Sequence, residues 1–257
     1  MRSSTWTRTS ACAATIGAPS CCGSARSVTN GTPSWKSGLR RPRKPRRRRP
    51  DRRSRPMLRV AITGGIGTGK SYVVRLLRRR AVPTIDADQL ARAAVQPGQP
   101  ATEALRARFG PDIVAVDGSL DRARLGRLVF ADPAARAALE ALVHPPVRRA
   151  IDAWFRRCGA CTDAPFAVAD IPLLFETGRA GAFDRVVVVA CDPAAQRERV
   201  MARDRLPAAE VDRRIAAQLP IADKVARADA VVTTDGSFDE TDRQVASLCR
   251  QLAAGGS

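Results

Sequence analysis

The sequence predicts an α/β fold in which helices cover both faces of a five-stranded parallel β-sheet. Three observations predict it. From Met57 onward, short apolar runs alternate with helical patterns, which is the order that buried parallel strands and their crossover helices produce. A glycine-rich turn directly follows the first run. The second run ends at Asp86 and the third begins at Phe166, a separation of roughly eighty residues and far more than one crossover needs.

The apolar runs have the length and composition of strands, and the segments between them have the three-to-four-residue spacing of amphipathic helices. We interpret the long gap as a helical insert with its own task. We expect strands at Leu58–Thr63, Val82–Asp86, Phe166–Asp170, Arg185–Ala190 and Ala230–Thr234. We expect helices at Lys70–Arg80, Gln89–Val95, Asp121–Phe130, Ala134–Arg157, Pro193–Asp204, Ala208–Gln218 and Phe238–Leu252.

Residues 1–56 carry most of the net positive charge. They hold 15 of the 44 Lys and Arg residues and a single acid, Asp51, in a chain of formal charge +19. The segment has no hydrophobic periodicity and contains the basic run Arg40–Arg49, so we expect it to be disordered. Three interpretations are open: a nucleic-acid-binding arm, an organelle transit peptide, or a stretch translated from upstream of the true start. We favour the third interpretation, because Met57 immediately precedes the first strand. If the protein binds nucleic acid, we expect it to do so only through residues 1–56.

The remaining composition argues against export and membrane insertion. No run approaches 18 consecutive apolar residues, and the chain does not begin with a secretory signal, so we expect no membrane partner and a cytoplasmic location. Seven cysteines without such a signal favour free thiols. Cys158 and Cys161 have the spacing of half a metal site, but no second pair follows them, so we expect a plain loop there.

The glycine-rich turn has the pattern of a phosphate-binding loop. Residues 64–71, GGIGTGKS, satisfy G-x4-G-K-[S/T] and directly follow a strand. Glycines permit the positive φ angles that bring backbone N–H groups against phosphate oxygens, and the following helix adds the positive end of its dipole. We expect Lys70 to reach the β- and γ-phosphates and Ser71 to ligate Mg²⁺. The expected ATP-binding residues are Gly65, Ile66, Gly67, Thr68, Gly69, Lys70 and Ser71.

A phosphate loop leaves GTPase switches, ATPase motors and small-molecule kinases open. A GTPase switch would carry an asparagine in its guanine-reading element. The only asparagine, Asn30, lies in the N-terminal segment, which argues against a switch.

Asp86 and Asp88 close the second strand, where alternation would place both on one side of the ligand-binding edge. One could accept a proton from an attacking hydroxyl while the other holds water around Mg²⁺. Alternatively, Asp88 only caps the next helix. Asp170, which ends the third strand, is a further candidate for Mg²⁺.

Several short motifs follow the loop, and their order along the chain indicates a particular family more specifically than the loop does. They are IDADQLAR (85–92), LVHP (142–145), IPLLFE (171–176), DPAAQR (192–197), RD (203–204) and RIAAQ (214–218). In this order they resemble the dephospho-CoA kinase family, over residues 57–252. The resemblance implies a P-loop NTPase three-layer fold with a core of residues 57–88 and 158–257. It also implies a helical substrate-binding insert at about 89–157 and a helical lid at about 202–218.

The resemblance further implies the reaction. Members of the family phosphorylate the ribose 3′-hydroxyl of dephospho-CoA with ATP and Mg²⁺, which gives coenzyme A and ADP. By this similarity Asp88 is the general base, and it acts together with Lys70 and Arg203. Another nucleoside or nucleotide kinase on the same scaffold is the alternative.

Phosphoryl transfer also needs positive charges that close over the phosphates. Arg199 and Arg203 are one helical turn apart at the start of the expected lid. We expect Arg203 to clamp the phosphates with support from Arg199. On the acceptor side we expect Asp86, Arg92 and the only histidine, His144, which would shape the substrate site rather than react. Tyr72 departs from the family, which usually has Thr or Ser there, and we expect it to pack or to lie beside the nucleotide.

Overall fold

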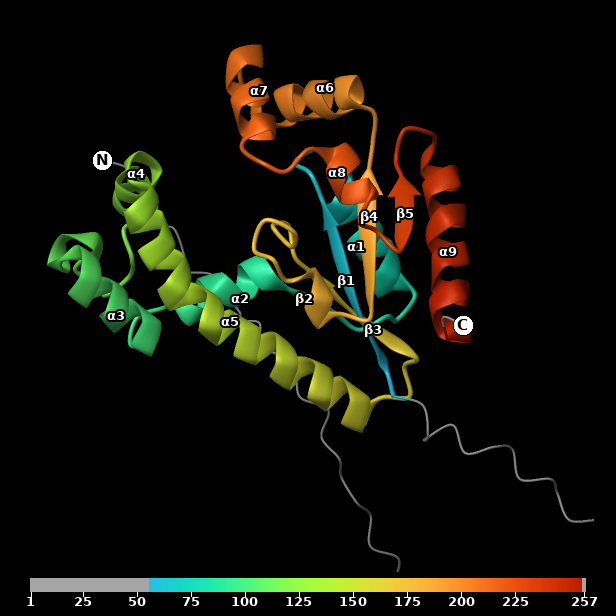
Figure 1. The fold of residues 1–257 in the computed structure, drawn as a ribbon, viewed down its shortest axis with the longest axis horizontal. Coiled ribbons are helices and arrows are strands. Elements are labelled where there is room, and N and C mark those ends of the chain that lie inside the picture. Colours follow the sequence, from blue (N-terminus) through green and yellow to red (C-terminus); the bar gives the residue numbers. More distant parts are fainter. Residues whose placement is uncertain (1–55, 256–257) are drawn as a thin grey trace, which may run out of the picture. The chain divides into compact units, whose positions relative to one another are not determined.

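The computed structural model describes residues 56–255. The expectations for residues 1–56 therefore lie outside the described residues, apart from Pro56. Figure 1 shows the order of the elements along the described part of the chain.

The five predicted strands are present as β1 (Leu58–Gly64), β2 (Thr84–Asp86), β3 (Phe166–Asp170), β4 (Arg185–Ala190) and β5 (Ala230–Thr233). They form one parallel sheet in the order β2-β3-β1-β4-β5. After the central strand β1, the chain builds β2 and β3 on one side and β4 and β5 on the other. The carboxyl end of β1 is therefore the switch point at which open α/β sheets bind ligands, and the predicted fold class is confirmed.

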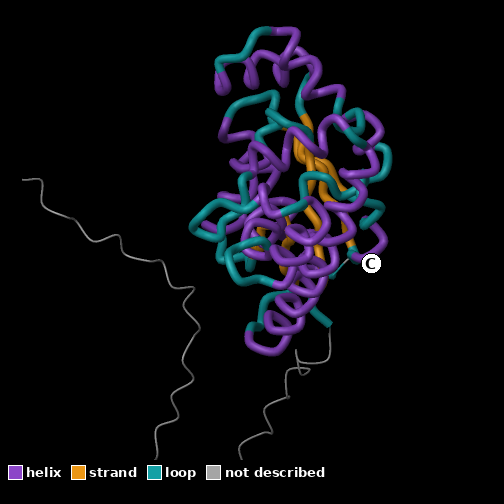
Figure 2. Tube along the Cα trace, turned by 90° about the vertical axis from the view of Figure 1, so that its left-hand side faces the viewer, coloured by secondary structure: helices purple, strands orange, loops and turns teal. Residues whose placement is uncertain are grey.

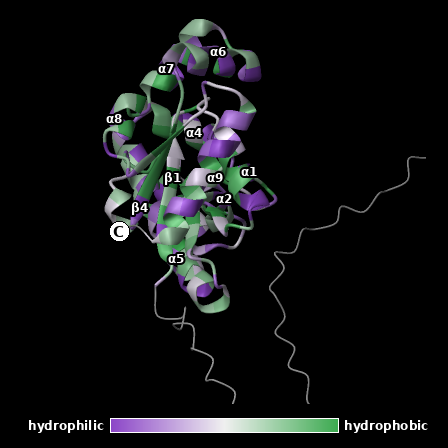
Figure 3. Ribbon diagram, turned by 90° about the vertical axis from the view of Figure 1, so that its right-hand side faces the viewer, coloured by the Kyte–Doolittle hydropathy of each residue, from purple (hydrophilic) through white to green (hydrophobic). Residues whose placement is uncertain are grey.

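Four helices cover the faces of the sheet: α1 (Lys70–Arg79), α9 (Phe238–Ala254), α5 (Pro133–Cys161) and α8 (Ile221–Val225). They form two layers because strand residues alternate between two apolar cores. Val60 and Ile62 of β1 lie in the core with α1 and α9, whereas Ala61 between them lies in the core with α5 and α8. Figure 2 shows the strands enclosed by helices, and Figure 3 shows β4 in hydrophobic colours.

The predicted helical insert between β2 and β3 consists of α2 (Ala87–Ala94), α3 (Pro100–Phe109), the short 3-10 helix η2 (Pro111–Ile113), α4 (Arg122–Ala131) and α5. It has a small core of its own around Leu105, Ile113 and Leu125. Aspartate side chains cap α2, α4 and α5 by accepting backbone N–H groups of the first turn. Because α5 contributes to both this core and the sheet core, it connects the insert to the sheet.

After β3 the chain forms the short 3-10 helix η3 (Ala180–Ala182), and β4 is followed by α6 (Pro193–Asp204) and α7 (Ala208–Ala216). Helix α7 and the last residues of α6 fall within the segment of about residues 202–218 in which we expected the lid (Figure 1). Among residues 56–255, no helix combines the length and the apolar character needed to cross a membrane.

The start of the second strand differs from the prediction for a local reason. It begins at Thr84 rather than Val82. The N–H of Val82 donates to the carbonyl of Leu77 at the end of α1, and Pro83 has no N–H to offer a neighbouring strand.

The long helix α5 also departs from the expected end. It runs past Arg157 to Cys161, so Cys158 and Cys161 lie in its last turn and not in a loop. All four cysteines among residues 56–255 are free, as predicted. Helices α3 and α8 have no counterpart in the prediction, and α8 is too short for a helical period to be detected. The remaining predicted ends agree with the structure within about two residues.

Candidate active site

The phosphate-loop sequence forms a tight turn between β1 and α1. Gly67 and Gly69 have φ angles of 77° and 80°, in the left-handed region that favours glycine. A Cβ atom on Gly67 would also lie 2.6 Å from Cγ2 of Val200 on α6. Thr68 is buried, and its hydroxyl donates to the carbonyl of Gly65 at 2.9 Å. Glycine conformations, close packing and internal hydrogen bonds therefore define the shape of the loop, as a preorganised phosphate site requires.

Two glutamines hold the loop at Ile66. The side-chain amide of Gln196, on α6, donates to the Ile66 carbonyl at 2.7 Å. The side-chain oxygen of Gln218, after α7, accepts the Ile66 N–H at 2.9 Å. This N–H, which we expected to contact ATP, is thus already bonded within the protein. Sequence reasoning missed both glutamines, although each lies in a motif, DPAAQR or RIAAQ, that carried the family resemblance.

Lys70 forms an ion pair with Asp170 at the carboxyl end of β3. The parallel register explains the position, because Asp170 pairs with Ile62 of β1 on one side and with Asp86 of β2 on the other. Burial raises the pKa of Asp170, Lys70 opposes that rise, and the negative charges of Asp86 and Asp88 add to it. The structure therefore places Asp86 and Asp88 within electrostatic range of the carboxylate that pairs with the lysine of the loop.

The two acids of the Asp-Ala-Asp motif do not share one side of a strand, contrary to the prediction. β2 ends at Asp86, and Asp88 lies in the first turn of α2. The helix cap is Asp86, whose Oδ1 accepts the N–H groups of Asp88 at 2.8 Å and Gln89 at 3.1 Å. The capping interpretation that competed for Asp88 is therefore wrong. Among residues 56–255, the exposed carboxylate of Asp88 has no hydrogen-bond or ion-pair partner.

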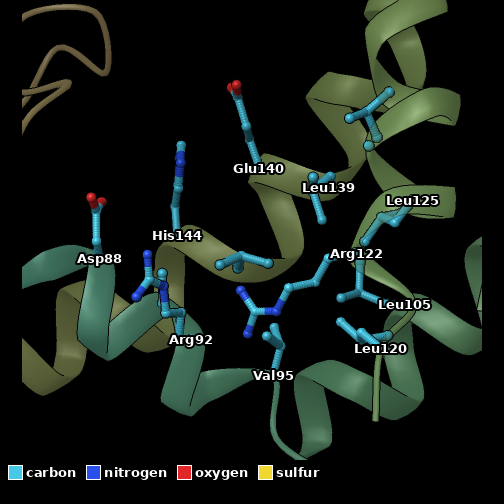
Figure 4. Close-up of a pocket in the computed structure, with 14 residues that line it drawn as sticks. Asp88, Arg92, Val95, Leu105, Leu120, Arg122, Leu125, Leu139, Glu140 and His144 are labelled. Atoms are coloured by element: carbon cyan, nitrogen blue, oxygen red, sulfur yellow. The ribbon is translucent and has the colours of Figure 1, made fainter. Parts of the chain in front are cut away.

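Asp88 and His144 lie where two cavities meet. The larger cavity, about 380 Å³, has mostly apolar walls from the insert, with Arg92, Arg122 and Glu140 among its polar residues. The smaller cavity, about 110 Å³, lies between α2, α5 and the segment after β3. In Figure 4, Asp88 and Arg92 project from α2 while His144 projects from α5 beside them. The predicted acceptor residues Asp88, Arg92 and His144 are thus brought together.

The surroundings of His144 disfavour its charged form. Burial lowers its pKa, the positive charges of Arg148 and Arg179 lower it further, and Glu140 opposes them. A neutral imidazole on a cavity wall can accept or donate a hydrogen bond at neutral pH. This agrees with a substrate-shaping role.

The two arginines that we expected at the start of the lid, Arg199 and Arg203, are held differently. The guanidinium of Arg199 donates to the hydroxyl of Thr234 at 2.9 Å and to its carbonyl at 2.6 Å. The hydroxyl of Thr234 in turn donates to the carbonyl of Thr68 at 2.9 Å, which connects Arg199 to the phosphate loop. Arg203 binds both carboxylate oxygens of Asp204, at 2.7 and 2.9 Å, and its side chain is 59% exposed. The structure therefore places Arg199 at the loop and Arg203 in solvent.

Tyr72 packs away from the loop. Its hydroxyl donates to Asp242 of α9 at 2.7 Å, and its ring centroid is 4.9 Å from that of Phe238. The guanidinium of Arg75 lies over the same ring at 5.1 Å. The expectation that Tyr72 packs is confirmed, and its phenol connects α1 to α9.

A buried ion pair supports the end of the lid region. Lys224 of α8 is fully buried and lies 2.7 Å from Glu176, which also accepts the N–H of Leu219 at 3.1 Å. Burial alone would raise the pKa of Glu176, but the hydrogen bonds from Lys224 and the backbone lower it overall. Sequence reasoning gave Lys224 no role. One feature of the sequence could have indicated a role for Lys224: residues 57–257 contain only two lysines, Lys70 and Lys224, among many arginines.

We expect Lys224→Met to destabilise the protein by about 3 kcal/mol, because it leaves Glu176 without its cation. The melting temperature measured by circular dichroism should fall by roughly 6–12 °C. The control is Arg213→Met, which removes an ion pair to Glu210 whose arginine is 77% exposed and should cost under about 1 kcal/mol. Equal melting temperatures for the two variants would contradict this prediction.

The fold and the site together define a class of protein. A phosphate loop occupies the switch point of the sheet, its lysine pairs with Asp170 at the end of β3, and cavities beside Asp88 leave room for a second molecule. This arrangement suits transfer of a phosphoryl group to an acceptor rather than to water, and the class is that of the P-loop kinases.

Comparisons with known proteins are more specific. The model of the dephospho-CoA kinase family matches residues 58–240. A dephospho-CoA kinase of Anaeromyxobacter dehalogenans is 49% identical over 193 residues, which cover 74% of this chain and 91% of the relative. One of Geobacter metallireducens is 43% identical over 195 residues, which cover 76% and 96%. The crystal structure of TT1252 from Thermus thermophilus is 39% identical with a TM-score of 0.68, and the match covers 77% of this chain and 99% of that one. This chain belongs to the dephospho-CoA kinase family, whose reaction is the phosphorylation of dephospho-CoA in coenzyme A synthesis.

Proposed function

We propose that the chain transfers the γ-phosphoryl group of ATP to the ribose 3′-hydroxyl of dephospho-CoA, with Asp88 as general base. The observation that supports this most directly is the position of Asp88. Its carboxylate is within electrostatic range of Asp170, the partner of Lys70, and it lines both cavities beside the insert. This position supports a role for Asp88 between the donor's phosphates and an acceptor in the cavities, where it accepts the proton of the attacking hydroxyl.

The donor side is assigned to the loop and the arginines. Backbone N–H groups of the loop from Gly65 to Ser71 bind the phosphates, except that of Ile66, which donates to Gln218. Lys70 exchanges Asp170 for the β- and γ-phosphates. Arg203 leaves solvent to cover the γ-phosphoryl group, and Arg199 remains at the loop. These positive charges stabilise the charge that develops on the transferred group.

The residues present fit a magnesium ion. The Ser71 hydroxyl follows Lys70 directly, and Asp86, Asp88 and Asp170 supply carboxylates at the same edge of the sheet. Mg²⁺ prefers such oxygen donors and keeps several waters and phosphate ligands. Within residues 56–255 no cluster of three His, Cys, Asp or Glu side chains is suited to hold a metal alone. When bound, the ion neutralises negative charge on the phosphates.

The insert, about residues 89–157, is assigned to acceptor binding and the segment of about residues 202–218 to a lid. Arg92 and His144 line the cavities assigned to the acceptor, and Asp86 lines neither of them. Asp86 acts mainly through the cap that fixes Asp88. We place the reaction in the cytoplasm, and it makes no use of residues 1–56.

The proposed function is tested with the full chain and with a protein that begins at Met57. ADP release, measured by a coupled assay, should require dephospho-CoA in both proteins and should be low with adenosine, shikimate or nucleoside monophosphates. ATP turnover that is independent of dephospho-CoA, or a preference for another acceptor, would overturn the proposal. Nucleic-acid binding that falls steeply with salt and is lost on truncation would instead support a binding role for residues 1–56.

A further inference from the structure

We propose that Arg148 and Arg179 form a binding site for the diphosphate of the acceptor, in the smaller cavity beside Asp88. This inference rests on the proposed function, because it assigns one part of the same substrate. Neither arginine belongs to the motifs that carried the family resemblance.

The two arginines come from different elements and meet at one cavity. Arg148 lies on α5, one turn after His144, and Arg179 lies at the start of η3. Both line the cavity of about 110 Å³, together with Asp88 and His144. The other walls are mostly apolar side chains. Arg179 is half-buried and Arg148 is exposed, so the recess opens to solvent on the side of Arg148. The cavity is therefore a cationic recess whose opposite wall carries the proposed base.

Asp88 carries the one carboxylate among the residues that line this recess, so two positive charges face a single negative charge. Among residues 56–255, neither Arg148 nor Arg179 has a carboxylate within ion-pair distance. The nearest acid to influence Arg179, Asp152, is bound to Arg59. Burial lowers the pKa of Arg179, and repulsion from Arg148 lowers it further. Two like charges held together at a cavity wall lose free energy unless an anion joins them.

The chemistry of the acceptor supplies such an anion. In dephospho-CoA the ribose that carries the 3′-hydroxyl also carries a 5′-diphosphate, only a few bonds away. A 3′-hydroxyl held at Asp88 would leave the diphosphate on the same side of the molecule as the two arginines. A guanidinium matches phosphate oxygens with two parallel N–H donors, so a pair of arginines suits a diphosphate.

The experiment compares Arg148→Gln and Arg179→Gln with Arg149→Gln in the full chain. Arg149 is an exposed arginine that is adjacent on α5 and lines neither cavity. We expect the KM for dephospho-CoA to rise by about ten-fold to a hundred-fold in the first two variants. It should change less than about two-fold in the control, and the KM for ATP should stay constant in all three. Arg179→Lys keeps the positive charge but loses the two parallel N–H donors of the guanidinium. Its KM for dephospho-CoA should therefore lie between those of wild type and Arg179→Gln.

A second probe separates the diphosphate from the rest of the acceptor. Adenosine has the same ribose and base but no phosphate, so its inhibition constant against dephospho-CoA should be equal in wild type and variants. An unchanged KM for dephospho-CoA, or an equal loss of adenosine binding, would overturn the diphosphate site. A wild-type protein that binds dephospho-CoA in calorimetry without phosphorylating it would contradict the proposed function alone, because the same variants can still be compared by binding.

Discussion

Asp88→Asn is expected to lower kcat by about 10²–10⁴-fold while the dissociation constant for ATP changes little. The amide has nearly the shape of the carboxylate but cannot accept a proton from the 3′-hydroxyl, and a positioned general base contributes rate of this order. Folding should be unaffected, because the backbone N–H of Asp88, and not its side chain, takes part in the helix cap. Steady-state rates with dephospho-CoA and calorimetric titration with ATP measure the two quantities.

The matched control is Asp223→Asn, another exposed aspartate in the first turn of a helix, which should keep its activity. If Asp88→Asn lost ATP and Mg²⁺ affinity as strongly as it lost rate, Asp88 would be assigned to the metal instead of the acceptor. A variant that retained wild-type kcat would refute the assignment of the base.

Lys70→Met is expected to lower kcat/KM for ATP by about 10²–10³-fold, the usual effect of removing one charged donor from a preorganised site. The variant removes the cation nearest to the transferred group and leaves Asp170 without its partner. Asp170 is 7% exposed and its pKa is already raised by burial. Without Lys70 its pKa should rise further, so Asp170 should protonate more readily. Rates at varied ATP concentration give the loss in kcat/KM.

The control for Lys70→Met is Arg75→Met, which removes an exposed positive charge from the same helix, α1. Its kcat/KM should remain within about two-fold of wild type, and the melting temperatures of the two variants should show whether Lys70→Met is folded. Wild-type kcat/KM for folded Lys70→Met would mean that the loop binds phosphate through its backbone alone.

Much of the fold could be predicted because its signals lie within short stretches of sequence. Each strand is an apolar run, each crossover helix has a regular apolar spacing, and the loop from Gly64 to Ser71 needs only its own glycines to turn. The insert could be inferred from the length of the segment between the second and third strands. The boundary at Val82 was missed because it depends on a hydrogen bond to Leu77, which apolar spacing does not reveal.

The candidate site was only partly accessible to the same reasoning. Asp88, Lys70, Arg92 and His144 could be proposed from motifs, and the structure brings Asp88, Arg92 and His144 to one cavity wall. The prediction that Asp86 and Asp88 lie on one side of a strand was wrong. Asp86 caps the next helix, which therefore begins two residues earlier than the sequence pattern suggests. The choice between strand alternation and a helix cap depends on which N–H groups find a partner, and that is decided by the folded backbone.

By itself the sequence determined the parallel α/β fold, the phosphate loop and the resemblance to a kinase family, since these depend on neighbouring residues and on the order of motifs. Only the tertiary structure decided which distant side chains meet. It joined Lys70 to Asp170 and Ile66 to Gln196 and Gln218, and it placed Arg148 and Arg179 on one cavity. The physical reason is that a charge or amide is recognised by its partners in space, and parallel strands bring together residues about one hundred positions apart.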